Sequence, residues 1–127
     1  LEFRRVLFRS SDGCHVVLVV SVRNPRQLMA HEELLEIQRT FPGHFRYHPV
    51  LTREWPDGWP YGKGRIIRST AGNGPVGRVD LGGLLEVVPD LPTRHLRFCG
   101  NAQARDQLQQ GLEQHGLAVP SLRAEVW

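Results

Sequence analysis

The sequence predicts an α/β fold built on an open, doubly wound parallel sheet with helices on both faces. Apolar, β-branched segments alternate with amphipathic segments along the chain, and clusters of Gly, Pro and Asn separate them. The first apolar segment is nearly continuous, which is typical of a strand that helices cover on both sides. Ligands of such sheets bind beyond the carboxyl ends of the strands, so functional residues are expected there.

The first half of the chain predicts a strand, a helix and a second strand. His15–Val22 is the continuous apolar strand, and an Asn-Pro pair ends it. Arg26–Thr40 places leucines and an isoleucine near helical spacing with glutamates between them, and a Pro-Gly pair stops this helix. His44–Thr52 alternates and then turns apolar, which favours a second strand.

The second half predicts a long loop and then a return to the alternation. The loop, Glu54–Gly77, is rich in Gly, Pro and Trp, and a short hairpin is expected around Arg65 to Arg68. The elements expected after it are a short helix capped by Asp80 and running through Val88, a strand at His95–Cys99, a helix capped by Asn101 and running to His115 with Gly116 as its stop, and a final strand at Leu122–Trp127.

Leu1–Ser10 reads LEFRRVLFRS and is interpreted as a translated sequencing-library adapter, because the adapter oligonucleotide encodes these ten residues. A basic arm or a targeting peptide is the alternative, but the small-residue cleavage site of a secretory signal is missing. The segment contributes +2 of the formal net charge of +3, so about +1 remains for residues 11–127. A nearly neutral domain lacks the excess positive charge with which a protein binds nucleic acid.

Residues 11–127 are expected to form part of one cytoplasmic domain that continues upstream. The longest apolar run, Val16 to Val20, is far shorter than the roughly 20 residues of a membrane-spanning helix. Cys14 and Cys99 are far apart and lack metal-ligand spacing, so two free thiols in a reducing compartment are expected.

The predicted strand ends carry a resemblance to the ferredoxin–NADP reductase family, which extends over essentially all of residues 11–127. Each match is short, and their order and spacing together make the resemblance specific. The matching elements are Val22-Arg23 before an acidic helix, Thr52-Arg53-Glu54 after a strand, Cys99-Gly100-Asn101 between a strand and a helix, and the terminal Ala124-Glu125-Val126-Trp127.

The resemblance implies a Rossmann-like NADP(H)-binding domain that is truncated at its N-terminus. The parent protein would be an enzyme that transfers hydride between NADPH and FAD and exchanges electrons with ferredoxin or flavodoxin. The flavin-binding barrel and the pyrophosphate loop of the family would lie upstream of Ser11. The chain alone is therefore expected to be inactive and to bind NADP(H) weakly.

The resemblance also assigns residues to the adenosine end of NADP(H). Arg53 would bind the 2′-phosphate, because a guanidinium group presents a planar fork of donors, and Thr52 would add a hydroxyl donor. Arg23 joins this group of cofactor-binding residues, and Tyr61 would stack on the adenine. Packing is the alternative role for Tyr61, and pairing with a carboxylate such as Glu54 is the alternative for Arg53.

Two further arginines resemble the second phosphate ligand of the family. They are Arg65, in Gly64-Arg65-Ile66, and Arg78, in Gly77-Arg78-Val79. Arg78 is preferred at this stage, because a predicted helix follows it directly as in the family.

At the nicotinamide end, the resemblance places Cys99 beside C4, and Gly100 and Asn101 in the same cofactor site. Glu125 would orient the nicotinamide, and Trp127 would stack on the flavin. The alternatives are an inert buried cysteine, a solvated glutamate and a core tryptophan. The family assignment predicts that Arg53, Cys99 and Trp127 gather around one cleft.

Two other patterns are discounted. Gly72–Gly77 fits G-x-G-x-x-G, but no clear strand precedes it and the predicted helix starts beyond it. His44 and His48 have no Cys or Asp at ligand spacing, so no metal site is expected. The competing functions are an NADH-dependent reductase component of an oxygenase and a non-catalytic α/β binding module.

Overall fold

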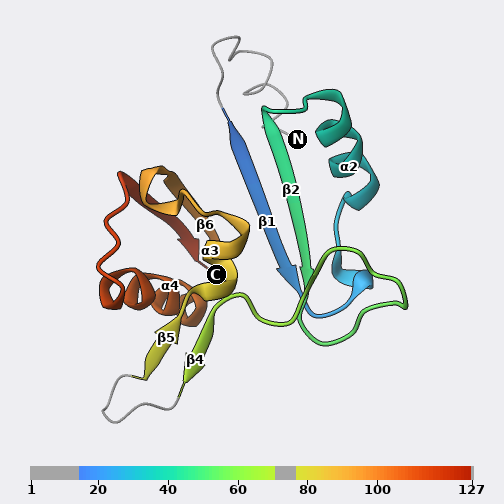
Figure 1. Cartoon of the computed structure of the whole chain (residues 1–127). Coiled ribbons are helices and arrows are strands. Elements are labelled where there is room, and N and C mark those ends of the chain that lie inside the picture. Colours follow the sequence, from blue (N-terminus) through green and yellow to red (C-terminus); the bar gives the residue numbers. More distant parts are fainter. Residues whose placement is uncertain (1–14, 71–76, 127) are drawn as a thin grey trace. The chain divides into compact units, whose positions relative to one another are not determined.

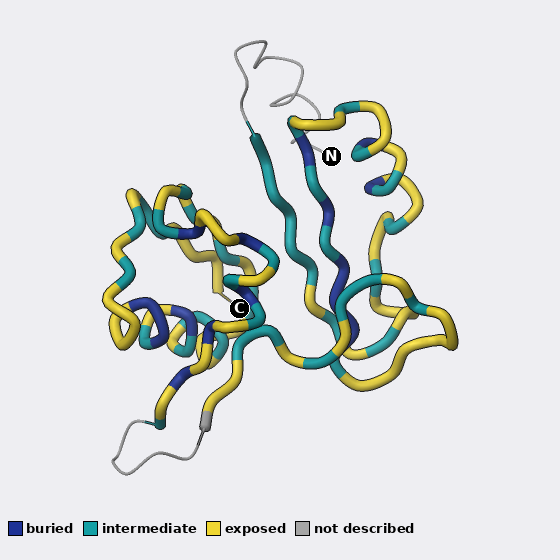
Figure 2. Tube along the Cα trace, in the orientation of Figure 1, coloured by how far each residue is buried: buried dark blue, intermediate teal, exposed yellow. Residues whose placement is uncertain are grey.

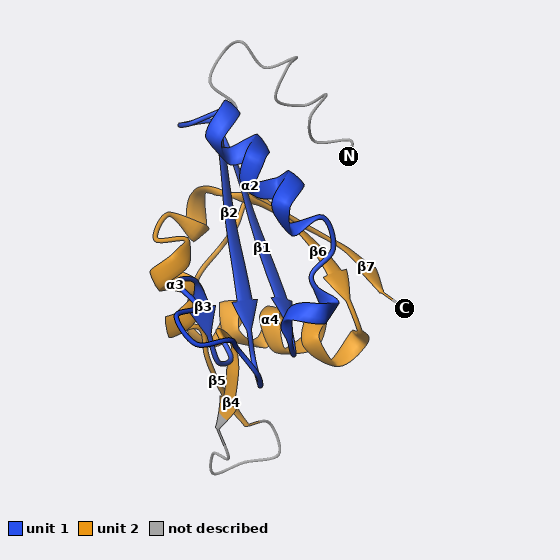
Figure 3. Cartoon of the chain, turned by 90° about the vertical axis from the view of Figure 1, so that its right-hand side faces the viewer, with its two compact units in different colours: residues 1–65 blue, residues 66–127 orange. Residues whose placement is uncertain are grey.

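The computed structural model describes residues 15–70 and 77–126. They belong to two compact units that divide between Arg65 and Ile66 (Figure 3). Trp127, Cys14 and most of the Gly72–Gly77 motif lie outside the described residues.

The first unit holds a three-stranded parallel sheet in the order β1-β2-β3. Figure 1 shows β1 and β2 side by side. β1, Val16–Val22, pairs along its whole length with β2, Phe45–Leu51, and β3, Gly62–Lys63, pairs with the end of β2. The two strands predicted before the loop are therefore confirmed. β3 was not predicted, because two residues within a Gly-rich loop carry no alternation.

The first helix is shorter than predicted. The 3-10 turn η1 covers Pro25–Gln27, and α2 covers only His31–Thr40, so the expected start at Arg26 was wrong. Ala30, just before α2, has the left-handed φ of 55°, which interrupts any right-handed helix. Leu34 and Ile37 of α2 are buried against Phe45 and Tyr47 of β2 and form the core of this unit (Figure 2).

The second unit contains a hairpin, a parallel strand pair and two α-helices. β4, Arg68–Thr70, pairs antiparallel with β5, Arg78–Asp80. The other elements are α3 at Gly82–Val87, the 3-10 turn η2 at Leu91–Thr93, β6 at His95–Gly100, α4 at Ala102–Gln114 and β7 at Ser121–Val126. β6 and β7 are parallel, so the predicted strand, helix and strand at the chain's end are confirmed.

The hairpin lies further along the chain than the sequence predicted. It joins Arg68–Thr70 to Arg78–Asp80 and is not centred on Arg65 to Arg68. Val79 in β5 is only 1% exposed, and its backbone N–H donates to the side chain of Gln114 at the end of α4 over 2.8 Å. A contact between residues 35 positions apart leaves no local pattern in the sequence.

Several glycines and polar residues have structural roles in the turns that flank the helices. α3 starts at Gly82, where the backbone N–H donates to Asp80 over 2.7 Å, and Gly83 lies so close to the backbone of Ile66 that a Cβ would sit 2.7 Å from its Cα. α4 begins as predicted, because Asn101 Oδ1 accepts from the Ala104 N–H over 2.8 Å. Gly116, with φ of 65°, ends it.

The α/β class with parallel strands is confirmed, and the described strands form three sheets with no closed barrel. Among the described residues, no helix has the length and apolar character needed to cross a bilayer.

Candidate functional site

The three parallel strands of the first unit end level with one another. Val22 is the register partner of Leu51, and Leu51 is the register partner of Lys63. The residues that leave this edge are therefore neighbours: Arg23 after β1, Thr52 and Arg53 after β2, and Gly64 and Arg65 after β3. The edge lies at the carboxyl ends of the strands, where α/β sheets bind their ligands.

Backbone hydrogen bonds continue past the strands and fix these residues. Thr52 N–H donates to Val22 over 2.8 Å, and the N–H groups of Arg53 and Glu54 both donate to the Arg23 carbonyl, over 3.1 and 3.0 Å. Gly64 N–H donates to Leu51 over 2.8 Å, and its φ of 80° turns the chain just before Arg65. The backbone at all three strand ends is thus held in place.

Arg23, Arg53 and Arg65, termed here the arginine edge, are all exposed. Within the described residues, neither Arg23 nor Arg53 makes a salt bridge, so the pairing of Arg53 with Glu54 is not observed. Like charges brought to one edge repel each other, and a bound anion relieves that repulsion. Guanidinium groups match a phosphate with paired donors, so the arginine edge can bind a phosphate group.

Asn24 is a candidate site residue that the sequence analysis did not single out. Its Oδ1 atom is buried and has no hydrogen-bond partner among the described residues. A buried acceptor without a donor costs about 1–3 kcal/mol, and a ligand hydroxyl or amino group would remove that cost. The sequence signal was the polar residue directly after Arg23 at a strand end, which was interpreted only as a strand stop.

Tyr61 belongs to an aromatic cluster with His31, Tyr47 and Trp59. Its ring centroid lies 4.9 Å from that of Trp59 and 5.8 Å from that of His31, both edge to face. His31 Nδ1 and the Tyr47 hydroxyl are hydrogen-bonded at 2.9 Å. This cluster fastens the loop after Arg53 to α2 and β2, so Tyr61 has a packing role, and its stacking on adenine stays a prediction.

The structure treats the two candidates for the second arginine differently. Arg65 follows β3 by one residue, at the same end of the sheet as Arg53. Arg78 opens β5 in the second unit, and α3 follows it after one short turn, as the resemblance suggested. Arg65 is therefore the one placed with Arg53 in a single unit, although the sequence argument preferred Arg78.

The second unit brings two predicted nicotinamide residues together. Cys99 on β6 and Glu125 on β7 are register partners, so their side chains share one face of the strand pair. Both are exposed, and Cys99 is a free thiol. The alternative of an inert buried cysteine is therefore wrong.

The neighbours of Cys99 also have structural roles. A Cβ on Gly100 would lie 2.7 Å from the Phe98 ring, so the glycine makes room for that ring. Asn101 uses its side-chain oxygen to cap α4. Trp127 lies outside the described residues, and Arg53 and Cys99 belong to different units, so their common cleft stays a prediction.

Residues 2–110 match the family model for the oxidoreductase NAD-binding domain. The chain belongs to this family. The match covers the arginine edge and Cys99, so the domain is a module that binds a pyridine nucleotide in an oxidoreductase. Glu125 of this NAD-binding domain lies beyond the matched range. No curated protein matches the chain significantly.

The matched range takes in residues 2–10, and the adapter origin of Leu1–Ser10 stays a prediction that genomic sequence would test.

In the described parts of the domain, no group of three His, Cys, Asp or Glu side chains could hold a metal ion. Burial lowers the pKa of His48, and the nearby Arg46 adds to the effect.

Proposed function

We propose that this NAD-binding domain is the NADP(H)-binding part of a flavin-dependent reductase. The parent enzyme transfers hydride between NADPH and FAD and exchanges electrons with ferredoxin or flavodoxin. The arginine edge is the observation that carries the proposal, because the extra phosphate is what distinguishes NADP(H) from NAD(H).

At the adenosine end, Arg53 and Arg65 bind the 2′-phosphate from two adjacent strand ends, and Arg23 adds a third positive charge. Thr52 donates its hydroxyl hydrogen to a phosphate oxygen. The buried Asn24 Oδ1 accepts a hydrogen bond from a ribose hydroxyl or from the adenine amino group. These contacts give both affinity and preference for the phosphorylated nucleotide.

At the nicotinamide end, Cys99 and Glu125 act from the same face of β6 and β7. The small thiol lets the nicotinamide approach without blocking C4, and the Glu125 carboxylate accepts a hydrogen bond from the carboxamide. When bound, NADP(H) supplies the hydride chemistry. FAD is expected to bind mainly through an upstream domain, with Trp127 against the flavin. We place the enzyme in the cytoplasm, in keeping with the free thiol of Cys99.

The test compares 2′,5′-ADP with 5′-ADP as ligands of the 127-residue chain by isothermal titration. We expect tighter binding of 2′,5′-ADP, and Arg53→Gln should weaken it about tenfold while leaving 5′-ADP unchanged, because a charge-assisted hydrogen bond contributes about 1.5–3 kcal/mol. Arg39→Gln, on the exposed face of α2, removes the same charge and should change neither affinity.

Equal affinity for the two ligands, or loss of both in Arg53→Gln, would overturn the 2′-phosphate assignment. That result would favour the NADH-dependent reductase component of an oxygenase. The flavin and the electron carrier are tested on the complete reductase, by its FAD content and by reduction of ferredoxin and flavodoxin with NADPH. A complete protein without flavin would leave only the non-catalytic binding module.

A further inference from the structure

One face of the β6–β7 pair is almost entirely polar. The register pairs His95 with Ser121, Arg97 with Arg123 and Cys99 with Glu125. Alternate residues of a strand point to the same face, so the six side chains of these three pairs share one side. Residues between them, such as Leu122, belong to the other side. Cys99 and Glu125 occupy the carboxyl end of this face, and the other two pairs lie further back along the strands.

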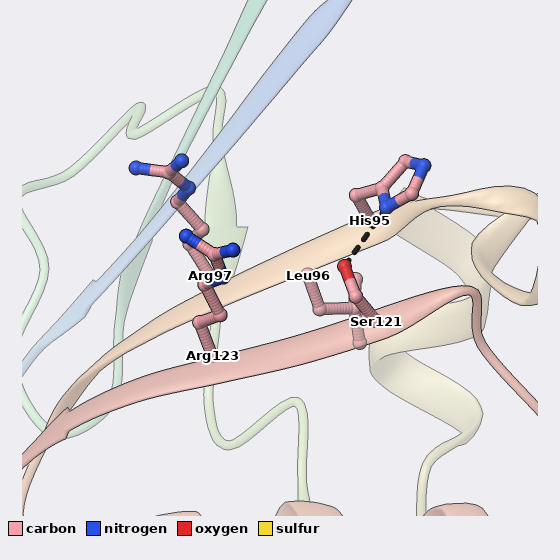
Figure 4. Close-up of a pocket in the computed structure, with 5 residues that line it drawn as sticks. All are labelled: His95, Leu96, Arg97, Ser121 and Arg123. Carbon is pink, nitrogen blue, oxygen red and sulfur yellow. Dashed lines mark hydrogen bonds between the residues drawn. The ribbon is translucent and has the colours of Figure 1, made fainter.

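The two pairs further back line an open hollow of about 210 Å³, formed by His95, Leu96, Arg97, Ser121 and Arg123 (Figure 4). A water molecule takes up about 30 Å³ of liquid volume, so the hollow has room for a phosphate group and several waters. The Arg97 and Arg123 side chains lie side by side in it.

Arg97 and Arg123 repel each other electrostatically when no anion lies between them. Like charges directly opposite each other on neighbouring strands destabilise a sheet. Neither guanidinium group makes a salt bridge to any described residue, and Glu125, the next residue of β7 on this face, makes none with them. Both side chains are exposed. A doubly charged anion between the two guanidinium groups would turn this repulsion into two charge-assisted interactions.

The other end of the hollow supplies neutral donors. His95 Nδ1 and Ser121 Oγ are hydrogen-bonded at 2.8 Å. When Nδ1 carries the proton, it donates to Ser121 Oγ, and the serine hydroxyl hydrogen is then available to an anion.

We propose that this hollow is a second anion site, which binds a phosphate-type oxyanion through Arg97 and Arg123 with Ser121 as a further donor. Its residues belong to the second unit and to other strands than those that carry the arginine edge. The oxyanion is either free phosphate or the phosphate group of a nucleotide.

The test titrates inorganic phosphate into the 127-residue chain at constant ionic strength and follows binding by NMR. We expect saturable binding, weakened about tenfold by Arg97→Gln and by Arg123→Gln. Arg105→Gln, on α4 of the same unit, is the matched control and should leave phosphate binding unchanged. Arg97→Lys and Arg123→Lys keep the charge but lose the planar fork, so each should weaken binding less than the glutamine change.

The source of the phosphate is settled by titrating NADP⁺ into the chain and into an Arg97→Gln, Arg123→Gln double variant. A parallel loss of NADP⁺ affinity assigns the hollow to a nucleotide phosphate, and unchanged NADP⁺ affinity assigns it to free phosphate. Circular dichroism verifies that each variant is folded. The proposal is overturned when phosphate does not bind saturably, when the glutamine variants bind as the parent does, or when Arg105→Gln weakens binding equally. None of these results depends on the Arg53 test.

Discussion

Tyr47 ties the sheet of the first unit to the loop that follows the arginine edge. Its side chain is only 3% exposed, its hydroxyl is hydrogen-bonded to His31, and the His31 ring contacts Trp59 and Tyr61. Burial raises the pKa of Tyr47 to about 12, and the nearby Tyr61 adds to the effect. One buried hydroxyl thus connects β2, α2 and the loop.

Replacing Tyr47 by Phe should lower the free energy of unfolding by about 1 kcal/mol at neutral pH, because one hydrogen bond is lost and His31 keeps an unpaired nitrogen. The stability that the Tyr47 hydroxyl contributes should also depend on pH in a defined direction. The folded-state pKa lies above the unfolded value of 10.0, so this stability is complete below pH 10 and is lost as the pH rises towards about 12. Urea unfolding across this range should show the alkaline loss in the parent chain and in Tyr61→Phe, and its absence in Tyr47→Phe.

Gly111 of α4 packs against Leu81, the residue just before α3. A Cβ there would lie 2.7 Å from Leu81 Cδ2 and 2.8 Å from its Cγ, and Leu81 is fully buried. Gly111→Ala should therefore destabilise the second unit by about 1–2 kcal/mol, since overpacking outweighs the gain of about 1 kcal/mol in helix propensity. Thermal unfolding measures it, and Gln109→Ala on the exposed side of α4 is the control. A more stable Gly111→Ala variant would show that Leu81 moves freely.

At the scale of elements, α4 shows how one helix organises a unit. It joins β6 to β7, its first turn is capped by Asn101, and Gln114 in its last turn holds β5 through two hydrogen bonds, from Val79 N–H over 2.8 Å and to the Gly77 carbonyl over 3.1 Å. The helix therefore supports both the strands that carry Cys99 and Glu125 and the hairpin that carries Arg78.

Asn101→Ala should destabilise α4 by about 1 kcal/mol, because the Ala104 N–H then has no intrahelical acceptor. Gln103→Ala changes an exposed residue two positions after Asn101 and should have little effect on the stability of α4. Hydrogen exchange of the first turn of α4 measures the difference. Equal protection in the two variants would mean that water replaces the cap at no cost.

At the scale of the whole molecule, the two ends of the proposed nucleotide site belong to different units. The arginine edge is in the first, and Cys99 and Glu125 are in the second. The 2′,5′-ADP titration therefore tests the adenosine end alone, independently of Cys99 and Glu125.

We expect the 127-residue chain by itself to show no NADPH-dependent dye reduction and only weak affinity for NADPH, because hydride transfer needs a flavin, which the proposed function assigns mainly to an upstream domain. Ferricyanide reduction in the presence of added FAD measures this. Extending the gene upstream should restore activity. Turnover by the present chain at the rate of the extended protein would contradict the assignment.

Much of the fold follows from the sequence, because its signals are local. The continuous apolar run of β1, the apolar spacing of α2, the Asn101 cap and the Gly116 stop each fix an element within a few residues. The sequence also singles out Arg53 and Cys99, since each follows or ends a predicted strand and matches a family motif, and their roles stay predictions. Errors occurred where local signals were weak or misleading, at the start of α2 and at the β4–β5 hairpin.

The sequence by itself determined which segments are strands and helices and that an NAD-binding oxidoreductase domain is present. Only the tertiary structure decided which side chains meet. The parallel pairing of β3 with β2 brought Arg65 to the same sheet end as Arg53, the register of β6 with β7 set Arg97 opposite Arg123, and the packing at the end of β1 left Asn24 Oδ1 without a partner. Periodicity reports the conformation of a segment, whereas strand register depends on contacts between residues far apart in the chain, which no local pattern records.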